Sequence, residues 1–298
     1  MIPVLEFQEI ARSFERGRPV LDGVTFSLEP GEVVGLLGRN GSGKTTLLRI
    51  AMGMLFPNGG SVRVFGLSPA ERPVEIKRRV GFVAEDHVLP SGSSIAELIA
   101  IHRYLFPKWD GALERELLDR FGLSPTSRVG KLSKGEARQV ALLCAVCHRP
   151  ELLILDEPAG GLDPAARREF LETSIQLLNR EGAAILFSSH YLGDVERIGG
   201  RVILLAEGKV KLDRRLDTLR EELSVAVVPC NAVSGAAALE ALPGCLRVRP
   251  VFGDWHAVFQ GAPDLVRLEL RESLSLDGIH CIGVPLEELF IELVGGNR

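Results

Sequence analysis

The chain has 298 residues, enough for about two domains, and 46% of them are hydrophobic. Its 35 basic and 39 acidic side chains nearly balance, which argues against the basic surface of a nucleic-acid-binding protein. No run of about 18–20 uncharged apolar residues predicts a transmembrane helix. The start of the chain lacks a signal-peptide pattern and the five cysteines lack a disulfide spacing, so we expect a cytoplasmic protein with reduced thiols.

The first part of the chain predicts strands. Residues 4–9 and 24–29 alternate between apolar and polar side chains, as half-buried strands do. Phe14 is expected in a short polar loop between them. Residues 32–37 form a short apolar run that is typical of a buried strand.

A glycine-rich sequence follows this buried strand: Gly38-Arg39-Asn40-Gly41-Ser42-Gly43-Lys44-Thr45-Thr46. It matches the G-x-x-x-x-G-K-[ST] phosphate-binding pattern, and residues 47–52 continue it at helical spacing. Glycines let the backbone approach phosphate oxygens, and the helix N-terminus supplies N–H donors. Lys44 would add a cation for the β- and γ-phosphates, and the Thr45 hydroxyl can ligate Mg²⁺. These nine residues therefore predict a nucleotide-phosphate site.

A helical segment interrupts the strands that follow. Residues 61–65 and 80–83 read as strands, and the second leads to Glu85. The periodicity is helical from residue 94 to about 121, within a predicted helical subdomain at about 86–150.

The helical subdomain ends with a helix that begins at a capping box. Ser133 and Glu136 form the S-x-x-E pattern, and the helix is expected to reach His148. Its last residues, Cys144-Ala145-Val146-Cys147-His148, spell the pattern of c-type haem attachment. We interpret them as core residues, because haem attachment needs an exported chain and an accessible site.

Two acids follow the next apolar run. Residues 152–155 predict a parallel strand buried on both faces, and Asp156 and Glu157 end it. Ligands of open α/β sheets bind at this carboxyl edge. A similar strand at 184–188 leads to His190.

The rest of the chain predicts a hairpin and a second domain. Residues 202–206 and 209–212 read as a closing hairpin. We expect a first domain at 1–222 and a small α+β domain at 223–298, with strands near 224–228, 246–251, 255–259 and 279–284 and helices near 234–242 and 264–271. Its last helix carries an apolar stripe, which consists of Leu286, Leu289, Phe290 and Leu293.

Together these motifs resemble the nucleotide-binding subunit of an ABC transporter over about residues 4–220. In the family's order, the Walker A loop corresponds to 38–46, the Q-loop to Glu85, the signature motif to 132–136, Walker B to 153–157, the D-loop to 161–163 and the H-loop to His190. The resemblance implies an α/β fold: a P-loop NTPase core with a mixed sheet, an antiparallel β subdomain and a helical insertion, followed by the small α+β domain.

The resemblance also implies roles for these residues in ATP hydrolysis. Phe14 would stack on adenine, with Val20 as a second apolar contact. Thr45, Glu85 and Asp156 would hold Mg²⁺. The catalytic residues would be Glu157 as general base or water-orienting group, His190 at the γ-phosphate, and Lys44. Ser133 and Gly135 would contact the ATP of a second subunit, so that a head-to-tail homodimer encloses two ATP molecules.

The chain departs from the usual family pattern at two motifs. Glu85 replaces the usual Gln of the Q-loop, and the signature reads Leu-Ser-Lys-Gly-Glu. Lys134-Gly135 and the small C-terminal domain resemble the branch whose permeases are separate exporter-type proteins. This branch implies an ATPase that powers export at the inner face of the cell membrane, without nucleic acid as a partner. The alternatives are a soluble ABC protein of DNA maintenance or ribosomes, and a regulatory ATPase without a transport role.

Overall fold

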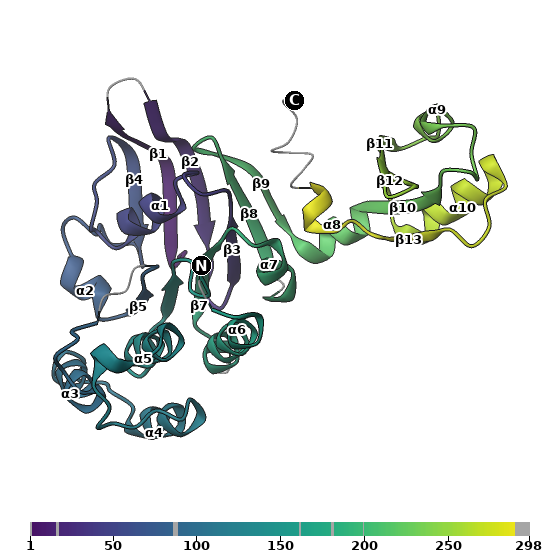
Figure 1. The fold of residues 1–298 in the computed structure, drawn as a ribbon. Coiled ribbons are helices and arrows are strands. Elements are labelled where there is room, and N and C mark those ends of the chain that lie inside the picture. The colour runs from purple at the N-terminus through teal and green to yellow at the C-terminus, as the bar shows by residue number, and fades with distance from the viewer. Residues whose placement is uncertain are drawn as a thin grey trace. The chain divides into compact units, whose positions relative to one another are not determined.

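The computed structural model describes residues 2–15, 18–85, 89–160, 162–179, 182–198 and 200–289. The chain divides into two compact units, Met1–Asp213 and Arg214–Arg298, so α8 (Leu216–Glu222) belongs to the smaller one (Figure 1). The domain boundary expected after residue 222 stays a prediction. Within the described ranges no helix has the length and apolar character that crossing a membrane requires.

A six-stranded sheet forms the centre of the larger unit (Figure 1). Its strand order is β5 (Val80–Val83), β6 (Leu152–Leu155), β7 (Ala184–Ser189), β3 (Val33–Leu37), β8 (Arg201–Ala206) and β9 (Lys209–Arg215). The first five strands are parallel, and β8 and β9 form the predicted hairpin. Every residue of β6 and β7 is buried, which explains why both appear in the sequence as continuous apolar runs.

A second, three-stranded sheet has the antiparallel order β2 (Arg18–Leu28), β1 (Leu5–Glu15) and β4 (Gly59–Val64). The expectation of a loop at Phe14 is wrong, because β1 continues to Glu15. The register with β2 shifts between Phe7 and Ile10, and Glu9 adopts a φ of 50°. This irregularity breaks the two-residue alternation, so the sequence pattern ends the strand too early.

The helices of the larger unit are α1 (Lys44–Ala51), α2 (Pro73–Lys77), α3 (Ile95–Leu105), α4 (Gly111–Arg120), α5 (Lys134–Val146), α6 (Pro164–Asn179) and α7 (Leu192–Ile198), with a 3₁₀ turn at Val129–Lys131. Complete capping boxes begin α3 and α5. Cys144, Cys147 and His148 are all buried, and burial raises the pKa of the Cys144 thiol to about 12. These residues therefore belong to the core, as expected from the sequence.

In the part of the chain that the structure describes, the smaller unit has an antiparallel sheet, two further helices and a helical segment at residues 286–289. The sheet order is β11 (Cys245–Val251), β12 (Asp254–Gln260), β10 (Leu223–Pro229) and β13 (His280–Gly283), and the helices are α9 (Ala236–Glu240) and α10 (Pro263–Leu274). All these elements match the predicted ones closely. Leu286 and Leu289 of the apolar stripe are buried, whereas Phe290 and Leu293 lie outside the described residues.

Candidate functional site

Four parallel strands bring the predicted motifs to one edge of the six-stranded sheet. Gly38 follows β3, Glu85 follows β5, Asp156 follows β6 and His190 follows β7. A cavity of about 320 Å³ lies at this carboxyl edge. Its lining consists of Val20, Asn40, Gly41, Gly43, Lys44, Thr45, Thr46, Glu85 and Glu157.

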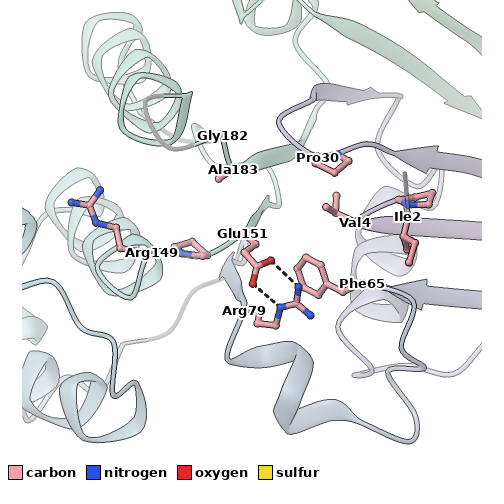
Figure 2. A pocket seen from close by; sticks show the side chains of 11 residues that line it. Ile2, Val4, Pro30, Phe65, Arg79, Arg149, Glu151, Gly182 and Ala183 are labelled. Carbon is pink, nitrogen blue, oxygen red and sulfur yellow. Dashed lines mark hydrogen bonds and ion pairs between the residues drawn. The ribbon is translucent and has the colours of Figure 1, made fainter.

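A larger cavity, of about 420 Å³, lies beside residues that precede β3, β5, β6 and β7, at the opposite edge (Figure 2). Arg79 and Glu151 form two hydrogen bonds there, of 2.6 and 2.7 Å. The Arg79 guanidinium also lies 3.8 Å from the centroid of the Phe65 ring. The ion pair neutralises both charges and links the starts of β5 and β6, so Arg79 and Glu151 have a structural role. The smaller cavity is therefore the better candidate for the functional site.

The loop at residues 38–43 requires glycine for steric reasons. Gly43 has a φ of 104°, and a Cβ atom there would lie 2.6 Å from Leu21 Cδ2. At Gly38 a Cβ atom would lie 2.5 Å from Ser42 Oγ. Ser42 Oγ is buried and has no hydrogen-bond partner among the described residues. A buried hydroxyl of this kind needs an acceptor, and a bound phosphate oxygen would satisfy it.

Lys44 begins α1 and is only 5% exposed. Its Nζ donates a hydrogen bond to the Gly38 carbonyl over 2.7 Å and lies 3.1 Å from Glu157 Oε1. The ammonium group is thus fixed between the loop and the end of β6. It can meet a negatively charged ligand in the cavity without a large movement.

Asp156 is buried beside two hydroxyl groups. Its Oδ1 accepts hydrogen bonds from Ser188 Oγ over 2.8 Å and from Thr45 Oγ1 over 3.1 Å. Burial raises the pKa of Asp156, and these two hydrogen bonds oppose the shift. The described residues contain no group of three or more His, Cys, Asp or Glu side chains that could hold a metal. The oxygens of Thr45 and Asp156 still suit Mg²⁺, which usually takes one or two carboxylates together with substrate phosphates.

Glu157 lies between Lys44 and His190. His190 Nδ1 is 2.7 Å from Glu157 Oε2, while Lys44 contacts the other carboxylate oxygen. The Glu157 backbone has a φ of 45°, and its N–H donates to Ser188 Oγ over 2.8 Å. The three residues predicted to be catalytic therefore form one connected group at the cavity.

Some predicted residues lie apart from this group. Phe14 is 60% exposed, and it is not among the described residues that line the cavity. Arg12 Cζ lies 4.9 Å from its ring centroid. Ser133 and Gly135 lie at the start of α5, and they do not line the cavity of their own subunit either. A Cβ atom on Gly135 would lie 3.6 Å from Leu162 Cδ2, so the signature and D-loop segments are close, although Gly161 itself is outside the described residues.

Sequence reasoning missed two polar residues that support the site. Ser188 was predicted only as part of a strand, but its hydroxyl bonds both Asp156 and the Glu157 backbone. Arg138 donates to backbone carbonyls of Glu157 and Glu85. No local pattern marks either role, because each depends on which strands and loops become neighbours in the fold.

Comparison with known proteins identifies the family. The ABC transporter family pattern matches residues 21–160. The chain is 32% identical over 297 residues to the Nod factor export ATP-binding protein I of Burkholderia thailandensis. This match covers 98% of the chain and 97% of the relative. The chain belongs to the ABC transporter ATP-binding family. As an ABC ATPase subunit, it binds and hydrolyses ATP to power transport across a membrane.

Two further comparisons agree with this assignment. The ABC ATPase subunit is 28% identical to the ABC transporter ATP-binding protein YtrB of Bacillus subtilis over 296 residues, 99% of each chain. The solved structure of an ATP-binding subunit of an ABC transporter matches with a TM-score of 0.66 and 31% identity, over 72% of this chain and 91% of that one. The predicted fold class and the predicted ATPase activity are confirmed.

Proposed function

We propose that this ABC ATPase subunit powers export through a separately encoded permease, at the inner face of the cell membrane. The relative from Burkholderia thailandensis, whose name includes export, matches almost the whole chain, including the smaller unit. The Lys134-Gly135 pair of the signature motif and the small C-terminal unit support the same branch.

We propose that hydrolysis takes place in the cavity at the carboxyl edge. Lys44 and the N–H groups of the 38–46 loop bind the phosphates, and Val20 of the cavity lining contacts the base. The exposed ring of Phe14, outside this lining, would stack on the same base. Mg²⁺, held by Thr45, Asp156 and Glu85, would supply charge neutralisation for the phosphoryl group.

Glu157 is proposed as the base that orients the attacking water and takes its proton. His190 and Lys44 each contact one oxygen of the Glu157 carboxylate, which fixes its direction. This connected group of three side chains is the observation that carries the proposal.

A homodimer would complete the site. Ser133 and Gly135 begin a helix, whose N–H groups and dipole favour phosphate, but they do not line the cavity of their own subunit. This separation supports a head-to-tail dimer, in which each signature motif contacts the ATP of the partner subunit.

The permease is proposed to contact the helical subdomain. A cavity of about 160 Å³ has an apolar lining that includes Met52, Met54, Phe82 and Phe106. Tyr104 of α3, two residues before Phe106 on the chain, is 87% exposed. An apolar hollow, with an exposed aromatic side chain two residues along the chain from its lining, suits a short amphipathic segment of a membrane protein.

The test of the proposed site is Glu157→Gln, which keeps the shape of the side chain and removes the base. Turnover should fall by about 10²-fold or more, while ATP still binds. The matched control is Glu151→Gln, at the other end of β6, which removes the ion pair with Arg79. The control should keep its turnover. Near-normal hydrolysis by Glu157→Gln would overturn the role of Glu157.

A further inference from the structure

Arg138 joins the signature helix to two loops of the active site. It lies on α5, beyond the Ser133 and Gly135 that begin the helix. Its Nη1 donates hydrogen bonds to the Glu157 carbonyl over 3.0 Å and to the Pro158 carbonyl over 2.9 Å. Its Nη2 donates to the Glu85 carbonyl over 3.1 Å. One guanidinium thus holds the backbone after β6 and the backbone after β5.

The backbone of Glu157 needs such support. A φ of 45° is unusual for a residue other than glycine, and the following Pro158 restricts Glu157 further. Such a conformation persists only where neighbouring groups hold it. Ser188 Oγ accepts the Glu157 N–H, while Arg138 and the Gly160 N–H, at 3.0 Å, donate to its carbonyl. The direction of the carboxylate follows from this backbone.

We propose that Arg138 is a positioning residue, which ties the carboxylate of Glu157 to the signature helix. The inference rests on the proposed function, because it takes Glu157 as the base. The N-terminus of α5 is proposed to meet the partner's ATP, and Arg138 connects the same helix to Glu157 of its own subunit. Binding of the partner's nucleotide at the N-terminus of α5 would therefore favour the hydrolytic position of Glu157, through the hydrogen bond between Arg138 and the Glu157 carbonyl.

The chemistry of arginine suits this task. The guanidinium is planar and carries several N–H donors at fixed angles, so it can bond three carbonyls from two loops at once. A lysine ammonium carries a similar charge but cannot reproduce this fork. Arg138 is not among the described residues that line the ATP cavity. Its loss should therefore slow hydrolysis much more than it weakens ATP binding.

The experiment compares steady-state ATP hydrolysis by the full chain and by the variants Arg138→Met and Arg138→Lys. We expect Arg138→Met to lower kcat by about 10- to 100-fold, because a small misplacement of a catalytic group has effects of this size. The KM for ATP should stay within about twofold, and Arg138→Lys should recover part of kcat. If Arg138→Met does not fold, Arg138→Gln, which keeps two donors, takes its place.

The matched control is Arg103→Met. Arg103 donates to the buried Glu114 over 2.6–2.9 Å, within the helical subdomain and away from the cavity. This control should lower the melting temperature and leave kcat unchanged. Adding Arg138→Met to Glu157→Gln should cause no further loss of kcat, because the side chain that Arg138 would position can no longer act as a base.

Three results would overturn the inference. The first is a wild-type kcat in Arg138→Met while Glu157→Gln is inactive, which refutes the role of Arg138 alone. The second is an equal loss of kcat in Arg138→Met and Arg103→Met, which shows general destabilisation. The third is normal hydrolysis by Glu157→Gln itself, which removes the proposed base and the inference together.

Discussion

Ser188→Ala is the change whose cost can be worked out most directly from the structure. The Ser188 hydroxyl is fully buried, accepts the N–H of Glu157 over 2.8 Å and donates to Asp156 over 2.8 Å. A buried N–H left without an acceptor costs about 1–3 kcal/mol, and a hydrogen bond to a charged group contributes about 1.5–3 kcal/mol. We therefore expect a loss of about 2.5–6 kcal/mol in the free energy of unfolding.

For a unit of this size the loss corresponds to a fall of roughly 5–25 °C in melting temperature. Thermal unfolding followed by circular dichroism measures it, together with ATP turnover, which should fall by about tenfold as Glu157 loses support. The control is Ser174→Ala, since among the described residues the buried Ser174 hydroxyl donates to the Phe170 carbonyl of its own helix, over 2.7 Å. Equal melting temperatures and equal turnover in the two variants would refute the reasoning.

Three other predictions test separate parts of the account. Glu85→Gln should keep ATP hydrolysis within about fivefold in a magnesium titration, because an amide oxygen can also ligate Mg²⁺; complete inactivity would contradict this. Burial lowers the pKa of His148 to about 4, below its unfolded value near 6.5, so stability is lost as the pH falls between these values. In urea unfolding, the decrease in unfolding free energy over this pH range should be about 3 kcal/mol smaller for His148→Phe than for the unmodified chain. The same pH dependence in both proteins would contradict this prediction. Finally, Glu157→Gln should sediment as a dimer with ATP and Mg²⁺ and as a monomer without nucleotide, whereas a monomer under both conditions would argue against the shared site.

Local patterns were sufficient for most of the fold. The capping box at Ser133, the apolar run at 152–155 and the turn at Glu207–Gly208 each depend on a few neighbouring residues, and the structure has the corresponding elements. The strand β1 was cut short because the irregularity at Glu9 interrupts its alternation. The short helix α7 was missed because seven residues give a weak periodic signal.

The site was predictable to the extent that its residues belong to motifs. Lys44, Asp156, Glu157 and His190 were named from strand ends and motif positions, and the sheet brings them together because parallel strands end at one edge. The supporting contacts of Arg138 were not predictable, since they join α5 to one loop 53 residues before Arg138 and to another loop 19 residues after it. Such contacts follow from the tertiary arrangement alone.

The most direct test of the central claim is equilibrium ATP binding by Lys44→Ala. The account predicts a folded variant whose ATP affinity falls by about 100-fold or more, because the phosphates lose a buried cation. Lys209→Ala, which removes an exposed ion pair with Asp22, should bind ATP as the unmodified chain does. Near-normal ATP affinity in folded Lys44→Ala would contradict the assignment of the cavity at the carboxyl edge as the ATP site.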